Sequence, residues 1–475
     1  MTDQGTRLGS RAVLNSTLVL GARTVSRLVA LVVVIALANH LGADRYGRYT
    51  TYVAYSSLVG VLIDLGLATL YTREAARAPD GLSEFLATLV TGKVALSVLA
   101  AGALAIALWL VGLHELIVPG AALLVATAYA VLLRNTFYAL GRLEFEVIAI
   151  LGETVIQAGL VIAGTRTGQD VPYFVWSYAA SYGFTCLFCL IVIPLFRLGR
   201  VRPGFDARLF FRWLRLAFPF AVGFFLTNLY FRADVPILQH FRPFREVGWY
   251  TFAYKPFEAL QFVPLAVQAV VYPVLAVYYK ESGPRLGLTY ERFFKVLVVL
   301  GWPLTVGTFI LVHPVGRLFR LFPESEPSLR ILSLGIVFLF VNSAFTAMLY
   351  AIDRQDLFAW TTAIAVVVNV GLNVALIPLY GYLAASATTV ITEMAFAVAG
   401  WTFVARRHRL PWLRLSWRTV LAGLVMGIVV YLLRRHSILL VAPAGGLVYL
   451  AALFGLRAVD RDEVTMLLRG FSTRV

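Results

Sequence analysis

The chain has 475 residues, of which 60% are hydrophobic and 14% are charged, and its mean hydropathy is +0.80. So apolar a chain cannot present a soluble surface, which excludes a soluble enzyme or binding domain. The net charge of +16 would suit a nucleic-acid-binding protein, but most Lys and Arg residues lie in short loops between apolar runs, as the positive-inside rule describes. The sequence therefore predicts a membrane protein.

Long apolar runs follow one another along the chain. Since about 20 apolar residues cross a hydrocarbon core of about 30 Å, the runs predict an all-α polytopic protein with about fourteen transmembrane helices. The predicted spans are residues 13–40, 47–70, 85–113, 117–140, 145–165, 172–196, 216–239, 249–277, 293–313, 331–352, 357–378, 381–405, 419–434 and 437–457. The first run is longer than the apolar region of a cleaved signal peptide. The distribution of loop Lys and Arg, with an even number of spans, predicts that both termini are cytoplasmic.

Two short motifs recur and divide the chain into similar halves. Residues 47–50 (Gly-Arg-Tyr-Thr) return 201 positions later as residues 248–251 (Gly-Trp-Tyr-Thr), and residues 139–142 (Ala-Leu-Gly-Arg) are echoed by residues 351–354 (Ala-Ile-Asp-Arg). Both echoes pair spans that are six apart, which predicts two pseudo-symmetric six-helix halves of the same orientation. We expect an N-terminal half at 1–200, a C-terminal half at 201–410, and two extra helices with a cytoplasmic tail at 411–475.

The segment between the two halves and the prolines that follow it carry further expectations. Arg208, Arg212 and Arg215 recur at helical spacing opposite Phe210 and Phe211, which predicts a helix on the cytoplasmic leaflet with its aromatic side chains at the interface. Spans 7 and 8 contain five prolines and spans 1 and 2 contain none, so we expect spans 7 and 8 to bend during transport and spans 1 and 2 to stay straighter. The prolines are Pro219, Pro236, Pro256, Pro264 and Pro273.

Eleven charged residues fall inside the predicted spans, where each costs at least about 2.5 to 3.5 kcal/mol and needs a partner, a cavity or a function. They are Arg23, Arg27, Asp64, Lys93, Arg134 and Glu153 in the first half, and Arg232, Asp234, Lys255, Glu258 and Glu393 in the second. The first half has an excess of two positive charges. We expect the six basic residues to bind substrate. The acids, with Asp64, Glu153 and Asp234 foremost, are expected to be structural partners or sites for a coupling proton or sodium ion.

No metal or cofactor is expected. Cys186 and Cys189 have the spacing of a redox or metal motif, but they lie within a span and have no second cysteine pair. We therefore interpret them as core residues.

Arg23 and Arg27 are the strongest candidates for contact with substrate. They lie one helical turn apart, roughly 15 and 21 Å along the first span counted from Val13, which predicts a position near mid-membrane. Guanidinium groups suit the bidentate binding of phosphate or carboxylate oxygens. In the alternative, both arginines form structural ion pairs with Asp64 and Glu153. The repeat carries Arg27 to Asn228, so we expect the corresponding helices to line one cavity.

Several segments resemble the bacterial polysaccharide transporter (Wzx-type flippase) family. In the first half they are residues 41–49 (Leu-Gly-Ala-Asp-Arg-Tyr-Gly-Arg-Tyr), 64–66 (Asp-Leu-Gly) and 73–74 (Arg-Glu). In the second half they are residues 217–219 (Ala-Phe-Pro), 232–234 (Arg-Ala-Asp), 248–250 (Gly-Trp-Tyr) and 381–388. The chain departs from the family pattern at Leu383, where glycine is usual.

The resemblance implies the fold of the multidrug/oligosaccharidyl-lipid/polysaccharide superfamily and no enzymatic activity. It implies that the protein flips an undecaprenyl-diphosphate-linked oligosaccharide across the bacterial cytoplasmic membrane, with a polysaccharide polymerase and chain-length proteins as further partners. A multidrug or cation exporter is one alternative, although it would favour an acidic cavity. A peptidoglycan-precursor flippase is another. A membrane glycosyltransferase or polymerase would normally carry a large external loop with paired acids, and the sequence has none.

Overall fold

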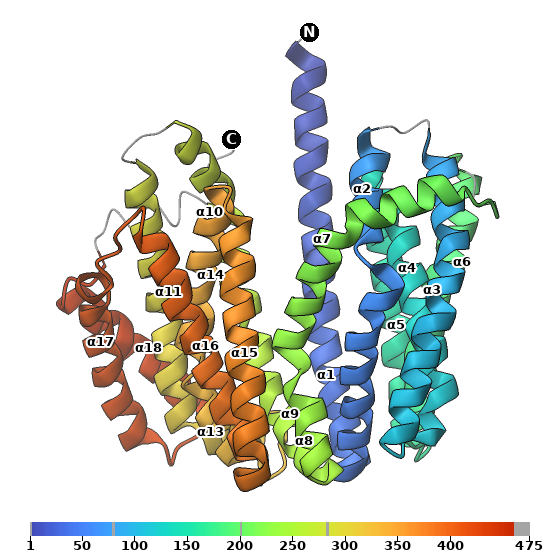
Figure 1. Cartoon of the computed structure of the whole chain (residues 1–475). Coiled ribbons are helices and arrows are strands. Elements are labelled where there is room, and N and C mark those ends of the chain that lie inside the picture. Colours follow the sequence, from blue (N-terminus) through green and yellow to red (C-terminus); the bar gives the residue numbers. More distant parts are fainter. Residues whose placement is uncertain (1, 78–80, 200–201, 282–284, 460–475) are drawn as a thin grey trace. The chain divides into compact units, whose positions relative to one another are not determined.

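The computed structural model describes residues 2–77, 81–199, 202–281 and 285–459, and the side chains from residue 18 onward. Throughout this part of the chain the regular elements are helices (Figure 1). The first eight are α1 (Thr2–Asp64), α2 (Leu67–Arg77), α3 (Leu82–Leu110), α4 (Ile117–Ala139), α5 (Leu143–Arg166), α6 (Val171–Leu195), α7 (Ala207–Arg232) and α8 (Asp234–Phe241). The others are α9 (Phe244–Leu260), α10 (Phe262–Lys280), α11 (Arg285–Ile310), α12 (Val312–Phe319), α13 (Ser325–Ser333), α14 (Ile336–Ala351), α15 (Gln355–Tyr380), α16 (Tyr382–Ala405), α17 (Trp412–Leu433) and α18 (Ile438–Gly455).

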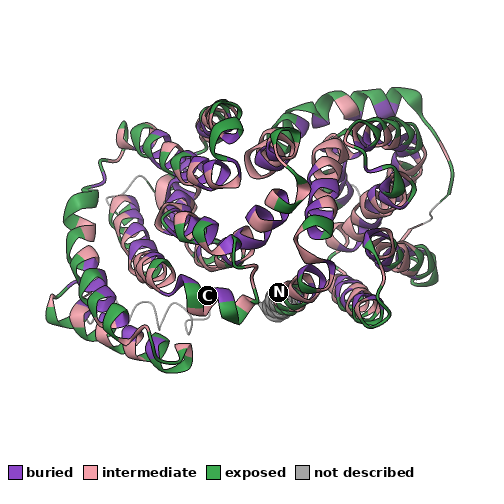
Figure 2. Ribbon diagram, turned by 90° about the horizontal axis from the view of Figure 1, so that it is seen from below, coloured by how far each residue is buried: buried purple, intermediate pink, exposed green. Residues whose placement is uncertain are grey.

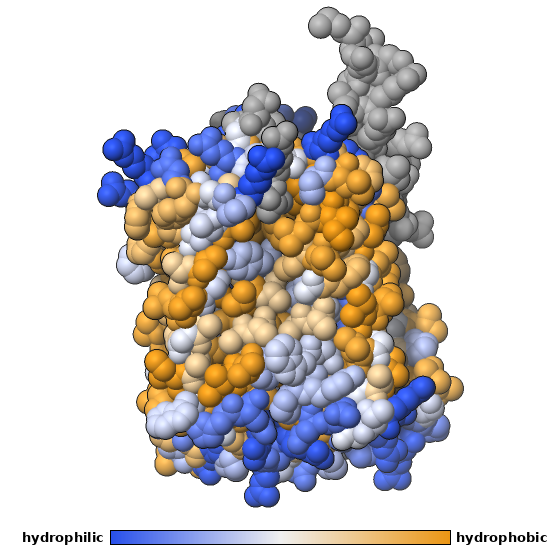
Figure 3. All heavy atoms as spheres, turned by 90° about the vertical axis from the view of Figure 1, so that its right-hand side faces the viewer, coloured by the Kyte–Doolittle hydropathy of each residue, from blue (hydrophilic) through white to orange (hydrophobic). Residues whose placement is uncertain are grey.

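The helices have the length and composition of membrane spans. Among the described residues, twelve helices are long and apolar enough to cross a bilayer, or thirteen if the bent pair α13 and α14 counts as one span. A kink at Gly42 divides α1 into two helices, which adds one more span to this number. The prediction of an all-α protein with about fourteen spans is confirmed. Figure 3 shows an apolar band between two hydrophilic ends on one face of the molecule.

The chain forms two compact units, Met1–Gly248 (unit 1) and Trp249–Val475 (unit 2). In each unit the buried sides of the helices face one another and the exposed sides face outward (Figure 2). The boundary leaves α7 and α8 with the N-terminal helices, because α7 packs against α1, α2 and α3. The division into halves at residue 200 and two appended helices stays a prediction.

The turns that follow α4 and α14 have the same geometry, which supports the repeat. Gly141 and Asp353 both adopt positive φ, at 66° and 56°. In each turn the next residue's N–H donates back to a helix carbonyl at 2.9 Å, from Arg142 to Phe137 and from Arg354 to Leu349. Each of the two arginines also binds the acid two residues later. The echo between residues 139–142 and 351–354 is therefore a repeated helix-ending turn.

Span 2 is broken although it contains no proline, and the expectation about which spans bend during transport stays a prediction. After Asp64 the helix stops at Leu65 and Gly66, whose φ angles are 43° and 77°, and α2 then begins. At Gly66 an added Cβ would lie 2.7 Å from the Phe220 Cβ and 2.8 Å from the Ala217 carbonyl oxygen. The expectation considered only prolines as a cause of bending. Here the helix breaks at a glycine with positive φ, against which α7 packs too closely for a larger residue. In span 8 the backbone stays helical at Gln261, between α9 and α10, so Phe244–Lys280 forms one candidate span.

The expected surface helix and span 7 form one helix, α7. Its N-cap residue is Asp206, whose carboxylate accepts a hydrogen bond from the Leu209 N–H. Figure 1 shows its first part lying across one end of unit 1 and its second part running along the unit. The aromatic side chains of Phe210 and Trp213 are buried in the core, while Phe211 is exposed. The expectation of an aromatic interfacial face is therefore wrong for Phe210, because α7 packs against the ends of α2 and α3.

The last two helices, α17 and α18, pack against each other and on α11. Their core contains Ala422, Met426 and Val430 from α17. The Tyr449 hydroxyl of α18 donates to the Val299 carbonyl at 2.8 Å. The segment that was predicted to be appended is thus anchored within unit 2.

Candidate functional site

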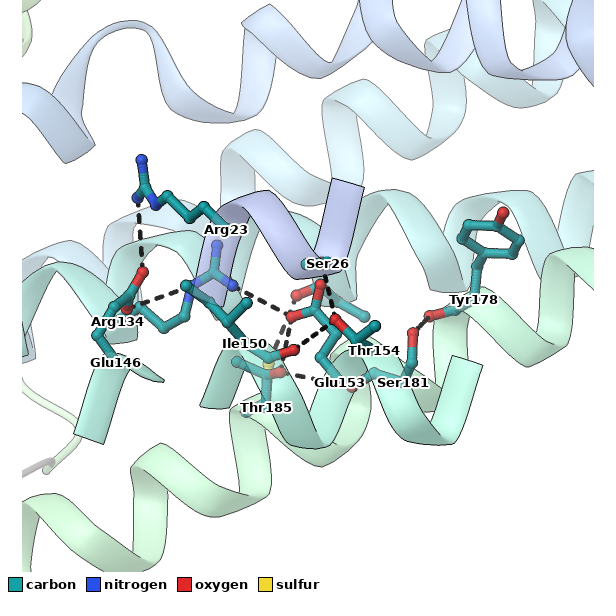
Figure 4. Close-up of polar contacts among 12 residues, drawn as sticks. Arg23, Ser26, Arg134, Glu146, Ile150, Glu153, Thr154, Tyr178, Ser181 and Thr185 are labelled. Atoms are coloured by element: carbon teal, nitrogen blue, oxygen red, sulfur yellow. Dashed lines mark hydrogen bonds and ion pairs between the residues drawn. The ribbon is translucent and has the colours of Figure 1, made fainter. Parts of the chain in front are cut away.

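A network of four charged side chains links α1, α4 and α5 within unit 1 (Figure 4). Arg23 lies 3.6 Å from Glu146, and its Nη2 donates to the Tyr138 hydroxyl at 2.6 Å. Arg134 lies 3.7 Å from the other oxygen of Glu146 and donates to Glu153 at 3.2 Å. The network thus alternates arginine and glutamate.

The two glutamates of the network are buried, whereas one of its arginines is exposed. The side chain of Glu146 is 1% exposed and that of Glu153 is 14% exposed, whereas Arg23 is 52% exposed. Two buried carboxylates at membrane depth need these cations, since an unpaired charge there costs several kcal/mol. On α6, Thr185 donates a further hydrogen bond to Glu153 at 2.9 Å.

Glu146 was absent from the predicted charges. It lies beside the predicted boundary of span 5, at residue 145, and a charge so close to a span end is ordinarily exposed. With Glu146 counted, the excess of positive charge in the first half falls from two to one. The signal in the sequence was helical spacing, since Glu146 and Glu153 are seven residues apart and share a face of α5.

The network lies nearer one end of unit 1 than the middle. Glu146 is in the first turn of α5, and Tyr138 is the second-last residue of α4. Arg23 is therefore level with the turn between α4 and α5. The estimate that placed it near mid-membrane took Val13 as the start of the membrane span, whereas the turn between α4 and α5 is level with Arg23.

Arg27 follows one turn after Arg23 and is exposed, and it extends the basic face of α1. Between the two arginines, Ser26 accepts a hydrogen bond from Thr154 on α5 at 2.7 Å. This contact holds the middle of the segment against α5. The helix that carries Arg23 and Arg27 is therefore held against α5 at a point between the two arginines.

A second ion pair lies at the break between α1 and α2. Lys93 on α3 donates to Asp64 at 2.8 Å, and the Lys93 side chain is fully buried. Asp64 also accepts the Ala68 N–H at 3.3 Å. Its carboxylate thus serves both the buried ammonium group and the start of α2. Of the two acids that might have paired with Arg23 and Arg27, Asp64 binds Lys93 and Glu153 binds Arg134.

Asp64 also lines a cavity of about 690 Å³ inside unit 1. The polar groups of its wall are mostly hydroxyls and amides, from α1, α2, α4, α6 and α7. They include Tyr49, Ser57, Asp64, Thr69, Asn135, Tyr178, Tyr182 and Asn228. On α6, the wall residues Tyr178 and Tyr182 lead one turn further to Thr185, which binds Glu153. The cavity therefore adjoins the charge network.

The remaining predicted site residues lie apart from this network. Arg232 ends α7, and the buried Asp234 begins α8 and accepts the Val235 N–H at 2.9 Å. Lys255 pairs with Glu258 at 2.8 Å, one turn along α9 in unit 2. Asn228, to which the repeat carries Arg27, accepts a hydrogen bond from Ser57 at 2.8 Å and lines the cavity of unit 1.

Comparisons with known families match both parts of the chain. A family model described as "Polysaccharide biosynthesis protein" matches residues 13–279. A second model, described as "Lipid II flippase MurJ", matches residues 259–443. No curated protein matches the chain in sequence.

Solved structures share the fold at low identity. A structure of lipid II flippase MurJ in an inward closed conformation has a TM-score of 0.72 at 16% identity, covering 94% of this chain and 99% of that chain. An inward-facing multidrug-resistance MATE transporter of the MOP superfamily has a TM-score of 0.61 at 15% identity, covering 80% and 94%. A MOP superfamily transporter from Pyrococcus furiosus has a TM-score of 0.51 at 16% identity, covering 84% and 94%.

The first family model covers more than half of the 475 residues, and it includes Arg23, Arg27 and the whole of unit 1 from residue 13 onward. The fold is that of the solved MurJ and MATE structures. The chain therefore belongs to the polysaccharide biosynthesis protein family and is a multi-pass membrane protein.

Proposed function

We propose that the protein flips an undecaprenyl-diphosphate-linked oligosaccharide from the cytoplasmic to the outer leaflet of the bacterial cytoplasmic membrane. The flipped glycan serves the synthesis of a cell-surface polysaccharide, such as an O-antigen of lipopolysaccharide or an exopolysaccharide. A polysaccharide polymerase and its chain-length protein take up the product. The family match supports a polysaccharide precursor, and alternating access is the mechanism that repeat-built transporters use.

The observation that carries this proposal is the half-exposed guanidinium of Arg23 beside the buried Glu146. Within the described residues, the hydrogen bond and the ion pair of Arg23 both engage Nη2, and about half of its side chain is exposed. Arg27 adds a second exposed guanidinium one turn away. Two such groups suit the oxygens of a diphosphate, because an arginine fork binds phosphate through two parallel N–H bonds.

The position of the network suits the entry of a substrate made in the cytoplasm. On the predicted topology the turn between α4 and α5 is cytoplasmic, and Arg23 lies level with it. The adjoining cavity of about 690 Å³ offers hydroxyl and amide groups to a glycan. Its one carboxylate, Asp64, is paired with Lys93, which disfavours the acidic cavity expected of a cation exporter.

The first experiment measures glycan export by cells that carry Arg23→Ala together with Arg27→Ala. We expect export to be abolished while the protein remains at its normal level in the membrane. Arg166→Ala, which removes an exposed arginine from the last turn of α5, is the matched control and should export normally. Normal export by the double variant would refute the anion-binding role.

A second variant separates anion binding from ion pairing. Arg23→Ala alone leaves Glu146 buried with one fewer cation, so a loss of export could come from misfolding. Arg23→Ala with Glu146→Gln removes that carboxylate charge. Export should stay lost if Arg23 binds the substrate. Recovery of export would show that Arg23 serves only to neutralise Glu146.

A peptidoglycan-precursor flippase is the second candidate function. The lipid II flippase model matches residues 259–443, and the MurJ structure covers 94% of the chain. Expression in two strains distinguishes the candidates, one lacking its O-antigen flippase and one depleted of its lipid II flippase. We expect rescue of the first strain. Rescue of the second strain alone would reassign the substrate to the peptidoglycan precursor.

A further inference from the structure

An apolar cavity of about 710 Å³ lies between α3, α4 and α6 of unit 1, and we call it the α4 groove. Its floor is α4, which packs against both other helices and contributes the small side chains of Ala121, Ala122 and Ala126. In its wall, Leu190 of α6 is 45% exposed, so the groove opens to the outside of the unit. Its volume is typical of a binding site for a small molecule, about 300 to 1,000 Å³.

The groove offers apolar surface to a ligand and almost no polar group. Its wall has two polar side chains, and each is bonded to the backbone of a neighbouring helix. The Tyr129 hydroxyl donates to the Val90 carbonyl at 3.0 Å, and the Cys186 thiol donates to the Ala126 carbonyl at 3.4 Å. A cavity lined in this way stays dry. Since the groove lies along membrane-spanning helices, a hydrocarbon chain is the ligand that it suits.

The groove is separate from the cavity that Asp64 lines. Both lie against α4, but Val125 and Tyr129 line the groove, whereas Thr127 and Val131 line the other cavity. Residues two apart in a helix of about 3.6 residues per turn lie on opposite sides. One face of α4 therefore borders an apolar site and the opposite face a polar one. A ligand of the groove does not depend on the proposed function, since that function places the glycan in the polar cavity.

One end of the groove lies near one end of unit 1. The start of α3 and the end of α6 meet there, since Gly199 lies against Leu82 of α3 and Ile193 of α6. Leu190, in the wall of the groove, is five residues before the end of α6, which corresponds to about 8 Å along the helix. The predicted topology places this end of unit 1 at the cytoplasmic leaflet.

Two arginines flank this end of the groove. Arg197 lies two residues beyond the end of α6. Arg202 lies in the segment beside α3, where the Gly204 N–H donates to the Thr91 hydroxyl at 3.2 Å. Both arginines are exposed, and neither forms an ion pair with another described residue. The apolar groove therefore ends beside two positive charges.

We propose that the α4 groove binds an acyl chain of an anionic phospholipid and that Arg197 and Arg202 bind its phosphate. The charge at the end of the groove selects the ligand. Guanidinium groups bind phosphate oxygens, and basic residues beside a membrane attract lipids of net negative charge. A bound chain contacts α3, α4 and α6 together, so the lipid stabilises unit 1.

Native mass spectrometry of the purified full-length protein tests the groove with added phosphatidylglycerol and phosphatidylethanolamine. Gly183→Leu should bind phosphatidylglycerol at least about tenfold more weakly, the loss expected when the new side chain excludes two buried methylene groups. Nothing lies within 4 Å of a Cβ added at Gly183, so the variant keeps its fold. The matched control is Gly159→Leu on α5, where the space is equally open but outside the groove, and it should bind as the wild type does. Unchanged binding by Gly183→Leu would overturn the proposal.

A second pair of variants tests the headgroup. Arg197→Gln with Arg202→Gln should weaken the binding of phosphatidylglycerol about 30-fold, since an arginine near an anionic lipid contributes about fivefold, and should leave that of phosphatidylethanolamine unchanged. Arg409→Gln with Arg414→Gln removes two exposed arginines from unit 2 and controls for net charge, so it should have no effect. Equal affinity of the wild type for the two lipids would contradict a site for an anionic headgroup.

Thermal unfolding in detergent gives an independent readout. Phosphatidylglycerol should raise the unfolding midpoint of the wild type and of Gly159→Leu, because a ligand that binds only the folded state stabilises it. It should leave the midpoint of Gly183→Leu unchanged, and an equal rise in all three proteins would count against the groove. Undecaprenyl phosphate is the competitor. If it bound more tightly than phosphatidylglycerol and lost that binding in Gly183→Leu, the groove would hold an isoprenoid chain and the proposal would be wrong.

Discussion

At the scale of single residues, Arg134 is the centre of the charge network of unit 1. It is the one cation that contacts both Glu146 and Glu153 among the described residues, and its side chain is 18% exposed. Arg23 lies at the open edge of the same network. The two arginines therefore differ in role, since Arg134 holds the buried acids and Arg23 faces outward.

Replacement of Arg134 by methionine should destabilise the protein strongly. The change keeps much of the side-chain volume but leaves two buried carboxylates short of a cation, which costs about 3 to 5 kcal/mol. The measurement is the unfolding midpoint in detergent. Arg45→Met is the control, because Arg45 forms a half-exposed pair with Asp170 at 3.7 Å that should contribute at most about 1 kcal/mol. Equal shifts for the two variants would contradict the buried role of Arg134.

The sequence predicted most members of this site but not their partners. Arg23, Arg134 and Glu153 were visible as charges within apolar runs. Their pairing depends on the packing of α1, α4 and α5, which helical spacing within one segment does not specify. Glu146 was missed because a charge at a helix end has the same sequence signature whether it faces water or the interior.

At the scale of elements, the break between α1 and α2 determines where Asp64 lies. Irregular backbone at membrane depth is tolerated where protein buries it or where it lines a cavity, and here it does both. The stop places the Asp64 carboxylate at the cavity wall and at the start of α2. The break in the span therefore places a carboxylate, that of Asp64, where it can contact a molecule in the cavity.

Gly66→Ala should destabilise unit 1 and disturb this cavity. The positive φ alone costs a non-glycine residue about 1 to 2 kcal/mol, and the new Cβ would overlap the Ala217 carbonyl oxygen of α7. Gly102→Ala on α3 is the control, because nothing lies within 4 Å of a Cβ there. Thermal unfolding in detergent should show a lower midpoint only for the Gly66 variant. Equal midpoints would show that α7 moves away at no cost.

The elements themselves were largely predictable, and the exceptions have a common cause. Apolar runs of about 20 residues identify spans because the bilayer sets their length. The same runs conceal the break at Leu65 and Gly66, since a single glycine within a span is common. The joining of the surface helix to span 7 in α7 was also hidden, because the arginines of its first part interrupt the apolar run.

At the scale of the whole molecule, the predicted orientation places both termini in the cytoplasm. Cysteine labelling tests it in a variant without Cys186 and Cys189. Asp170→Cys should react with a membrane-impermeant maleimide added outside the cell, because the turn between α5 and α6 is predicted to be external. Asp353→Cys should react only after the membrane is opened. The reverse pattern would invert the topology and place the Arg23 network at the outer end.

The two glycines of the repeated motif meet in unit 1, and the contact is reciprocal. A Cβ on Gly47 would lie 1.8 Å from the Phe244 carbonyl oxygen, and a Cβ on Gly248 would lie 2.0 Å from the Ala43 carbonyl oxygen. The backbone of each helix thus packs against the motif glycine of the other helix. Because substitutions at the two glycines would disrupt the same interaction, their effects on the free energy of unfolding should not add. Once an alanine at either position has separated the helices, an alanine at the other has little left to disrupt, and the double variant should be scarcely less stable than either single variant.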